Sequence, residues 1–329
     1  MTENDDNRLE REERLRLIRD SAASLVPRDG DLRRVRRQRF TGEGVDRQAW
    51  SEVCAMGWPG LRLDEGQGGS GLGMAEYAAL LEELGRGLLP EPLIEASLVA
   101  PLLPAAEREA LLAGERLILP AGLDAAPSCQ WNAGTLTGEV THVYLGAAAD
   151  AWLVASAAGL VLVEADAAGV ELSREATQDG AHLARLRFEA TPGRLLEGVQ
   201  AALDDAALAS AAYLVGLMDG AFERTLEYLR VRQQFGRQIG SFQALQHRAV
   251  DLKIQIELSR AIVAEAAAAI DAGVPLAERQ RKVSTARVRA AEAALLVTRQ
   301  AVQLHGGIGY TDEADIGLFL RRVMVLLNL

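Results

Sequence analysis

The sequence predicts an α+β protein in three consecutive parts: a helical domain over residues 1–114, a small β domain over 115–193 and a helical bundle over 194–329. Apolar residues recur at helical spacing at both ends of the chain. Between these ends, short runs rich in Val, Leu and aromatics are separated by Gly, Asp and Pro. Of the 329 residues, 49% are hydrophobic and 25% charged, which is typical of a soluble globular protein.

Amphipathic patterns and a capping residue predict the first helices. Leu9, Leu15 and Ile18 recur at helical spacing within a charged segment. Asp46 is placed to cap a second helix, which stops at Gly57. These signals indicate two short amphipathic helices early in the chain.

A glycine-rich segment at residues 65–73 separates these helices from the next one. It lacks the preceding strand and the lysine that a phosphate-binding P-loop needs, so we interpret it as a turn. The helix that follows should run from Met74 to about Gly87, with Pro90 and Pro92 ending it.

The middle of the chain changes to strand-like patterns. We expect a reduced β-barrel or sandwich of antiparallel strands. The strand candidates are residues 117–120, 140–144, 152–154, 160–163 and 183–188.

The last third of the chain returns to long helical patterns, which predicts a four-helix bundle. Alanine-rich stretches in this part would allow the helices to approach closely. The predicted helices cover residues 195–234, 242–271, 276–305 and about 312 to the end.

Charge and composition argue against several classes of partner. The net charge of −11 disfavours nucleic acid and anionic membrane surfaces. No apolar run is long enough to span a membrane, and the charged N-terminus is not a signal peptide, so we expect a cytoplasmic protein. Cys54 and Cys129 are interpreted as reduced core thiols. The four histidines lack metal-ligand spacing, so no metal site is predicted.

The stretch from Tyr228 to Asp251, YLRVRQQFGRQIGSFQALQHRAVD, predicts two helices that meet at a corner. Arg232 ends the first helix and Gln243 begins the second. A guanidinium, an amide and a helix N-terminus together suit an anionic, polar ligand. An Arg near a helix end is also commonly a C-cap or a surface ion pair.

Three motifs resemble those of flavin-dependent acyl-CoA dehydrogenases. The pattern R-x-x-F-G-x-x-I-x-x-F-Q-x-x-Q-H, which starts at Arg232, resembles a signature of that family's C-terminal domain. The run from Gln303 to Thr311, QLHGGIGYT, resembles a second signature of the same domain. Near the start of the chain, W-x-x-x-x-x-M-G-W-P-G-L from Trp50 resembles the N-terminal helical domain of the family.

The resemblance implies FAD as cofactor and a site shared between subunits. In the family, one subunit contributes these motif residues to the ADP part of the FAD held mainly by its neighbour. Chemically, a guanidinium suits the pyrophosphate, an amide suits the ribose or adenine, and glycines let backbone N–H groups approach. The implied cofactor-binding residues are Arg232, Phe235, Gln243, Gln303, Leu304, His305, Gly306 and Gly307.

No residue matches the catalytic base that the resemblance leads us to expect. The family's usual glutamate would fall about one residue beyond Leu329, and its alternative position falls on Ala206. Asp204 and Asp205 are close in sequence, but each helical residue turns the side chain by about 100°. The T-E-P-x-x-G-S-D-type segment that wraps the flavin in the family is not found between residues 117 and 135.

The resemblance therefore implies a non-catalytic supporting subunit. A full-length catalytic acyl-CoA dehydrogenase would bind most of the acyl-CoA, in an α2β2 heterotetramer of the kind that acts on steroid-derived CoA esters. Trp131 or Trp152 would close the unused half-site. Two alternatives stay open: a self-sufficient homo-oligomeric enzyme using Asp204 or Asp205 as a displaced base, and a flavin-free scaffold protein.

Overall fold

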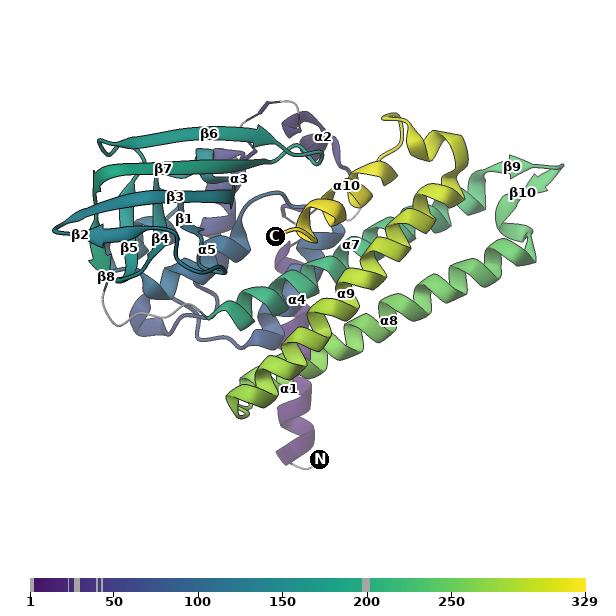
Figure 1. Cartoon of the computed structure of the whole chain (residues 1–329). Helices are drawn as coiled ribbons and strands as arrows, with labels where there is room; N and C mark the ends of the chain where they lie inside the picture. Colours follow the sequence, from purple (N-terminus) through teal and green to yellow (C-terminus); the bar gives the residue numbers. More distant parts are fainter. Residues whose placement is uncertain (1–2, 23, 27–29, 40, 43, 197–201) are drawn as a thin grey trace. The chain divides into compact units, whose positions relative to one another are not determined.

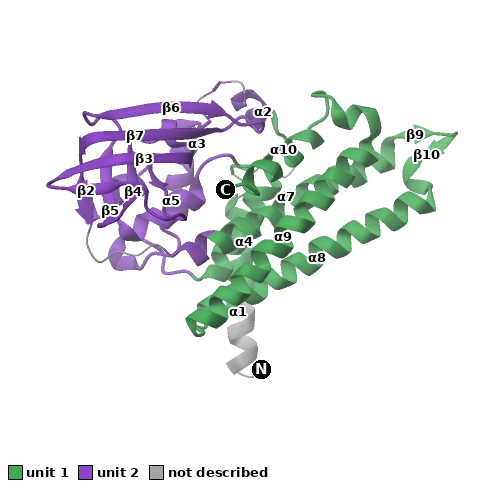
Figure 2. Cartoon of the chain, viewed as in Figure 1, with its two compact units in different colours: residues 1–33, 73–89, 207–328 green, residues 34–72, 90–206, 329 purple. Residues whose placement is uncertain are grey.

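The computed structural model describes residues 3–22, 24–26, 30–39, 41–42, 44–196 and 202–329. Helices at both ends of the chain flank a run of strands, so the predicted α+β class is confirmed (Figure 1). The chain forms two compact units, each built from separate segments (Figure 2). One comprises residues 1–33, 73–89 and 207–328, and the other comprises residues 34–72, 90–206 and 329. The sequence-based boundaries near residues 114 and 193 stay a prediction.

Long helices make up the first unit, which we call the helical unit. Helices α8 and α9 form an antiparallel pair, α10 packs on α9, and α4 packs on α1 and α8. The elements of this unit are α1 (Glu3–Ala22), α4 (Met74–Arg86), most of α7 (Leu203–Val231), α8 (Gln243–Asp271), α9 (Leu276–His305), the 3-10 helix η6 (Gly306–Tyr310) and α10 (Ile316–Leu326), together with the short strands β9 (Gln233–Gln234) and β10 (Arg237–Gln238).

Glycines allow α4 and α7 to cross at close range within this unit. A Cβ on Gly85 would lie 2.2 Å from the backbone oxygen of Tyr213, and one on Gly216 would lie 1.9 Å from that of Glu82. No side chain fits at either position, so the two backbones are in direct contact there. This crossing fixes the start of the helix that later carries Arg232.

The second unit contains two four-stranded sheets within the described residues, and we call it the β unit. Their strand orders are β1-β4-β5-β8 and β2-β3-β7-β6. The strands are β1 (Ile118–Ala121), β2 (Gln130–Asn132), β3 (Thr135–Tyr144), β4 (Ala151–Ser156), β5 (Gly159–Glu164), β6 (Val170–Ala176), β7 (His182–Pro192) and β8 (Arg194–Leu196). Short helices accompany them: α2 (Arg33–Gln38), α3 (Arg47–Ala55), α5 (Leu93–Val99) and α6 (Ala105–Leu112).

The prediction of a purely antiparallel β domain is wrong in one strand pair. Strand β1 pairs with β4 in parallel, with Ile118 opposite Ala151. The chain leaves β1, forms β2 and β3 in the other sheet, and returns as β4 running in the same direction. This crossover between sheets cannot be inferred from strand patterns alone.

The expectation that Trp152 closes a ligand site is also wrong. Trp152 is fully buried, and its ring meets Phe188 edge-on at 6.4 Å between centroids. Its indole N–H donates to the carbonyl of Gly146 at 2.9 Å. Trp152 is therefore a core residue of the β unit, whereas Trp131 lies half-buried on β2.

Several helix ends follow local signals, and others do not. Asp46 caps α3 as predicted, because its Oδ1 accepts the backbone N–H groups of Gln48 at 3.0 Å and Ala49 at 3.3 Å. Helix α4 likewise has the predicted bounds, since it runs from Met74 to Arg86 with Gly87 as its cap, and the two prolines follow the cap. Helix α7 starts at Leu203 and not at residue 195, because residues 194–196 pair with β5 as strand β8.

Candidate functional site

The predicted corner after α7 is a tight β-hairpin at the end of the helical unit (Figure 1). Strands β9 and β10 pair as two residues each, and the N–H of Ile239 donates to the carbonyl of Arg232 at 2.9 Å to close the hairpin. Phe235 and Gly236 form its turn, with φ of 54° and 77°. Positive φ at both positions is the signature of a type I′ turn, which disfavours a large side chain such as Phe.

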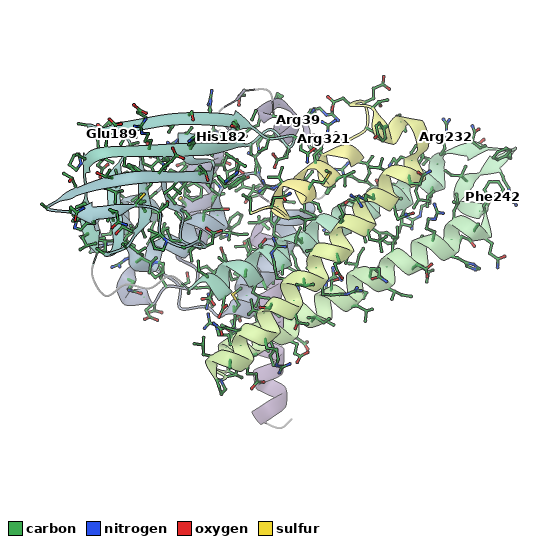
Figure 3. All side chains as sticks on the ribbon, in the orientation of Figure 1. Arg39, His182, Glu189, Arg232, Phe242 and Arg321 are labelled. Atoms are coloured by element: carbon green, nitrogen blue, oxygen red, sulfur yellow. The ribbon has the colours of Figure 1, made fainter. Side chains whose placement is uncertain are left out.

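Two residues predicted to bind the cofactor lie exposed on either side of this hairpin. Arg232 follows the last residue of α7 (Figure 3), and its guanidinium has no side-chain or backbone partner among the residues that the structure describes. Gln243 is the first residue of α8, whose N-terminus has no side-chain cap. The open N–H groups of that helix start and the free guanidinium both favour an anion.

Aromatic rings stabilise the hairpin between these two polar groups. The guanidinium of Arg237 lies 4.1 Å from the centroid of the Phe242 ring, a cation–π contact. Phe235 meets the same ring edge-on at 6.1 Å and is nevertheless 90% exposed. An aromatic side chain held in solvent by a strained turn is typical of a contact surface.

The second predicted motif forms the end of α9. Gly306 ends the helix with φ 66° and ψ −145°, a conformation that essentially only glycine adopts. A Cβ on Gly306 or Gly307 would meet nothing within 4 Å, so the backbone there is open to a ligand. Gln303 is exposed, whereas Leu304 and His305 are buried and could reach a ligand only through their backbone.

A stack between Tyr228 and His305 brings the two motifs together. Their ring centroids are 4.5 Å apart with 21° between planes. The Nδ1 of His305 lies 2.8 Å from the carbonyl of Ala301, and burial lowers the pKa of this histidine. A neutral imidazole whose Nδ1–H donates to the carbonyl of Ala301 explains both the short distance and the lowered pKa.

Sequence reasoning missed Tyr228 as a site residue. Tyr228 lies one helical turn before Arg232, and the N–H of Arg232 donates to its carbonyl at 2.9 Å. The spacing of one helical turn from Arg232 could have marked Tyr228 as a neighbour of the site. It could not show that the Tyr228 ring stacks on His305, which lies 77 positions later in the chain.

The carboxylates considered as a displaced base lie at the start of α7. Asp205 accepts a hydrogen bond from a guanidinium nitrogen of Arg62 at 2.5 Å, within the β unit. Both side chains are partly buried. The carboxylate of Asp205 is thus already engaged by a neighbouring side chain within that unit. Asp204 is also engaged in an interaction.

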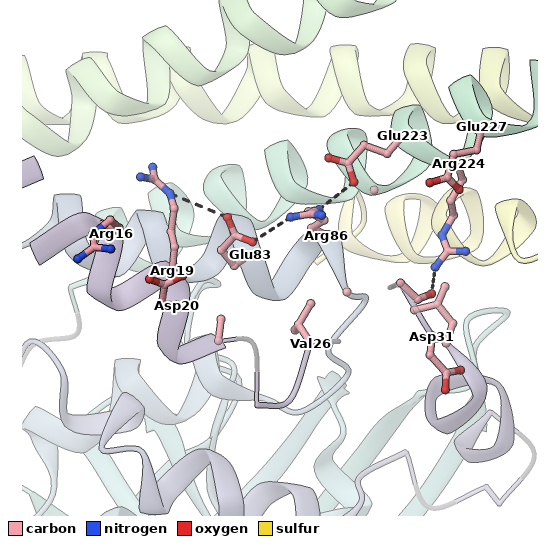
Figure 4. Close-up of a pocket in the computed structure, with 15 residues that line it drawn as sticks. Arg16, Arg19, Asp20, Val26, Asp31, Glu83, Arg86, Glu223, Arg224 and Glu227 are labelled. Carbon is pink, nitrogen blue, oxygen red and sulfur yellow. Dashed lines mark hydrogen bonds and ion pairs between the residues drawn. The ribbon is translucent and has the colours of Figure 1, made fainter. Parts of the chain in front are cut away.

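A cavity of about 430 Å³ lies elsewhere in the helical unit (Figure 4). Its wall carries a chain of ion pairs, in which Glu83 lies 4.0 Å from Arg19 and 3.4 Å from Arg86, and Arg86 lies 2.9 Å from Glu223. These charges neutralise one another, and no predicted cofactor-binding residue lines the cavity. The candidate site is therefore the open edge at the hairpin and the α9 terminus.

Within the residues that the structure describes, no cluster of three or more His, Cys, Asp or Glu side chains could hold a metal ion. No helix in the same residues is long and apolar enough to cross a membrane.

The chemistry of the open edge suits the diphosphate end of a dinucleotide. Arg232 offers a planar fork of donors, Gln243 offers an amide, and the Gly306–Gly307 backbone can be approached closely. All of these donors belong to one compact unit. These groups are hydrogen-bond donors, which suit the binding of an anion.

Comparisons with known proteins identify the family. The family model for the acyl-CoA dehydrogenase N-terminal domain matches residues 12–109, and the model for the acyl-CoA dehydrogenase C-terminal domain matches residues 196–327. Acyl-CoA dehydrogenase IpdE2 of Mycobacterium tuberculosis is 32% identical over 311 residues, which cover 94% of this chain and 91% of that protein.

Solved structures agree with this assignment along nearly the whole chain. The Tcur3481-Tcur3483 steroid ACAD G363A variant matches with a TM-score of 0.86 and 30% identity, covering 95% of this chain and 92% of that chain. The ChsE4-ChsE5 complex of Mycobacterium tuberculosis matches with a TM-score of 0.81 and 25% identity, covering 96% and 91%. The chain thus belongs to the acyl-CoA dehydrogenase family, whose members are FAD-dependent flavoproteins.

Proposed function

We propose that this chain is the non-catalytic, supporting subunit of an FAD-dependent acyl-CoA dehydrogenase. Its open edge binds the ADP and pyrophosphate end of an FAD that a full-length catalytic partner holds. Arg232, Gln243 and residues 303–307 supply these contacts, with Phe235 packing beside them. The partner binds most of the acyl-CoA, and the two kinds of chain assemble as an α2β2 heterotetramer.

The free guanidinium of Arg232 is the observation that carries this proposal. Other exposed arginines of the chain pair with carboxylates, such as Arg187 with Glu189 at 2.5 Å. Arg232 instead stands without a partner among the described residues, beside the uncapped start of α8. A guanidinium left free at a helix N-terminus is well placed for a phosphate supplied by another molecule.

The proposed roles of the two chains, cofactor binding here and proton removal in the partner, follow from the side chains that this chain carries. When bound, FAD accepts the hydride in this family's dehydrogenation of an acyl-CoA. Removal of the α-proton needs a carboxylate that is free to accept it. Here the alternative base position is Ala206, and Asp205 is paired with Arg62. This chain therefore orients the cofactor, and the partner removes the proton.

A steroid-derived CoA ester is the substrate class that we propose for the assembly. One matched structure is a steroid ACAD whose name joins two gene products, and another is a complex of two named proteins. These likenesses extend over more than nine tenths of each chain. They support a two-chain enzyme for bulky substrates, with the substrate pocket mainly in the partner.

Substitution of Arg232 tests the proposal. The chain is co-expressed with each full-length acyl-CoA dehydrogenase of its own genome, and FAD per complex is measured by absorbance. Hydrogen bonds to a charged group contribute about 1.5–3 kcal/mol, so Arg232→Ala should weaken FAD binding by about 10- to 100-fold while the complex stays intact. Arg230→Ala is the matched control, because Arg230 is also exposed near the end of α7.

Two results would contradict the proposed function. One is an unchanged FAD content in the Arg232→Ala complex, which would favour a flavin-free scaffold. The other is stoichiometric FAD together with acyl-CoA oxidation in the chain purified alone, which would favour a self-sufficient enzyme.

A further inference from the structure

Helix α1 packs on α4 with little apolar burial. Six of residues 12–22 are charged. Within this stretch only Ala22 is buried, Leu15 and Ile18 are half-buried, and Leu17 is 56% exposed. A surface helix of a globular protein normally buries a full stripe of apolar side chains. Apolar contact therefore contributes less than usual to holding this helix in place, and polar contacts contribute more.

Two ion pairs join α1 to α4. Arg14 lies 3.4 Å from Glu76, and Arg19 lies 4.0 Å from Glu83, the second pair being drawn in Figure 4. The side chains of Arg14 and Arg19 are 47% and 44% exposed, so water and salt reach both pairs. Ion pairs in contact with solvent are weak and are screened by salt. The attachment of α1 thus depends on contacts that salt weakens.

The charged cavity in the helical unit lies against the second half of α1. Arg19 and Asp20 line it from α1, and Glu83 and Arg86 line it from α4. Close-packed protein interiors contain few voids larger than a water molecule. A cavity of about 430 Å³ therefore shows that this half of α1 is not closely packed on its neighbours.

The C-terminal end of α1 is attached differently. Ala22 is 1% exposed, and the N–H of Val26 donates to its carbonyl at 2.8 Å. A Cβ on Gly87 would lie 2.3 Å from Cγ1 of Val26, so this valine packs directly on the backbone at the end of α4. Apolar packing thus fixes this end of α1, while the ion pairs hold the part that precedes it.

The carboxylates on α4 can lose α1 at low cost. Glu83 also lies 3.4 Å from Arg86, so it keeps a partner when Arg19 leaves. Glu76 pairs only with Arg14 among the described residues, and water would reach Glu76 once α1 moved away. Neither carboxylate would become a buried, unpaired charge, which is the costly outcome. The attached and released states of α1 therefore differ by a small free energy.

We infer that residues 12–22 form a strap whose attachment to α4 is controlled by ionic strength. At low salt, the two ion pairs hold the strap over the cavity. Between about 0.1 M and about 1 M salt, the screening length falls from about 10 Å to about 3 Å. The strap then releases, hinged at Ala22, while the rest of the helical unit stays folded. Release opens the cavity and uncovers the side of α4 that carries Glu76 and Glu83.

Hydrogen exchange of the full chain, measured by mass spectrometry, tests this inference. A peptide covering residues 12–22 should exchange about 3- to 10-fold faster in about 1 M than in about 0.1 M NaCl, because two weak contacts are lost. A peptide covering residues 252–263 of α8 should exchange equally in both, which shows that the chain stays folded. The double variant Arg14→Gln/Arg19→Gln should exchange fast at low salt already and respond little to added salt.

Arg16→Gln is the matched control. Arg16 is exposed on the same helix, and its Nε donates to Glu13 of α1 itself at 2.9 Å. The variant loses one charge but keeps both ion pairs with α4, so it should keep the salt response of the unsubstituted chain.

Three results would overturn the inference. The first is an exchange rate of residues 12–22 that does not rise with salt. The second is an equal acceleration of the α8 peptide, which would indicate unfolding of the whole unit. The third is a loss of the salt response in Arg16→Gln as large as in the double variant, which would indicate fraying of α1 and not the breaking of its ion pairs with α4.

Discussion

Tyr228 holds two distant segments of the candidate site in register. Its ring stacks on His305, which is the last residue of α9, and Arg232 follows it by one helical turn. The stack can affect cofactor binding even if neither ring touches the cofactor. The stack sets the position of the Gly306 backbone relative to the Arg232 guanidinium, so Tyr228 is a positioning residue.

Replacing Tyr228 should therefore lower FAD retention without touching a cofactor contact. An aromatic pair contributes about 0.5–1.5 kcal/mol beyond its buried area, so Tyr228→Leu should weaken FAD binding by the co-purified complex about 2- to 10-fold. Tyr228→Phe keeps the ring and should bind FAD as the unsubstituted complex does. The role is refuted if Phe and Leu reduce FAD equally, as measured by flavin absorbance across a dilution series.

His182 makes the stability of the β unit depend on pH. It is buried, and its Nε2 accepts the backbone N–H of Ala147 at 3.0 Å, so the ring is neutral. Burial, helped by the positive charge of Arg174, lowers the pKa of this histidine below its ordinary value of 6.5. The unfolded chain then binds a proton at a higher pH than the folded chain does.

The free energy of unfolding should consequently fall as the pH is lowered below about 6.5, and this loss should level off below the folded-state pKa of His182. In His182→Gln, the side-chain carbonyl can still accept the Ala147 N–H but does not titrate. The variant should show a shallower decline between pH 7.5 and 5.5 in urea unfolding. Identical pH dependence in both proteins would contradict this role.

Among the elements, α4 depends on a cap supplied by another helix. Its own N-cap, Gly73, has no side chain, and the carboxylate of Asp271 at the end of α8 takes that place. Oδ1 of Asp271 accepts the N–H of Met74 at 2.6 Å, and Oδ2 accepts that of Ala75 at 3.1 Å. A Cβ on Gly73 would lie 2.9 Å from both oxygens, so glycine lets the carboxylate approach.

Removing this cap should destabilise the helical unit. Loss of a capping side chain costs about 0.5–2 kcal/mol, and Asp271→Ala should lower the free energy of unfolding by about that amount in chemical denaturation. Asp271→Asn keeps one accepting oxygen and should lose less. Equal losses in the two variants would show that the carboxylate acts through charge and not through two accepted hydrogen bonds.

At the scale of the whole molecule, the proposed FAD site is divided between two chains. A ligand that binds only the folded state stabilises it by about 2.7 kcal/mol at a hundredfold excess over Kd. FAD added to the isolated chain should therefore leave its Tm unchanged. FAD added to a flavin-depleted complex should raise the Tm by several degrees in differential scanning fluorimetry. A clear shift in the isolated chain would contradict a divided site.

Much of the helical unit could be predicted from local signals. Helices expected at 242–271 and 276–305 are observed as Gln243–Asp271 and Leu276–His305, because long amphipathic patterns end at Gly273 and Pro275. The motifs around Arg232 and Gln303 likewise identified the family. Strand β6 was missed, because nearly all of its residues are exposed and give no alternating pattern.

The sequence by itself determined the order of helices and strands, the ends of the longest helices and the family, because these depend on residues close together in the chain. Only the tertiary structure decided which distant groups meet. Asp271 caps a helix 197 positions away, Arg62 holds a carboxylate 143 positions away, and β1 pairs with β4 in parallel. Such contacts form only when separate elements pack, and no local pattern records which element will be the neighbour.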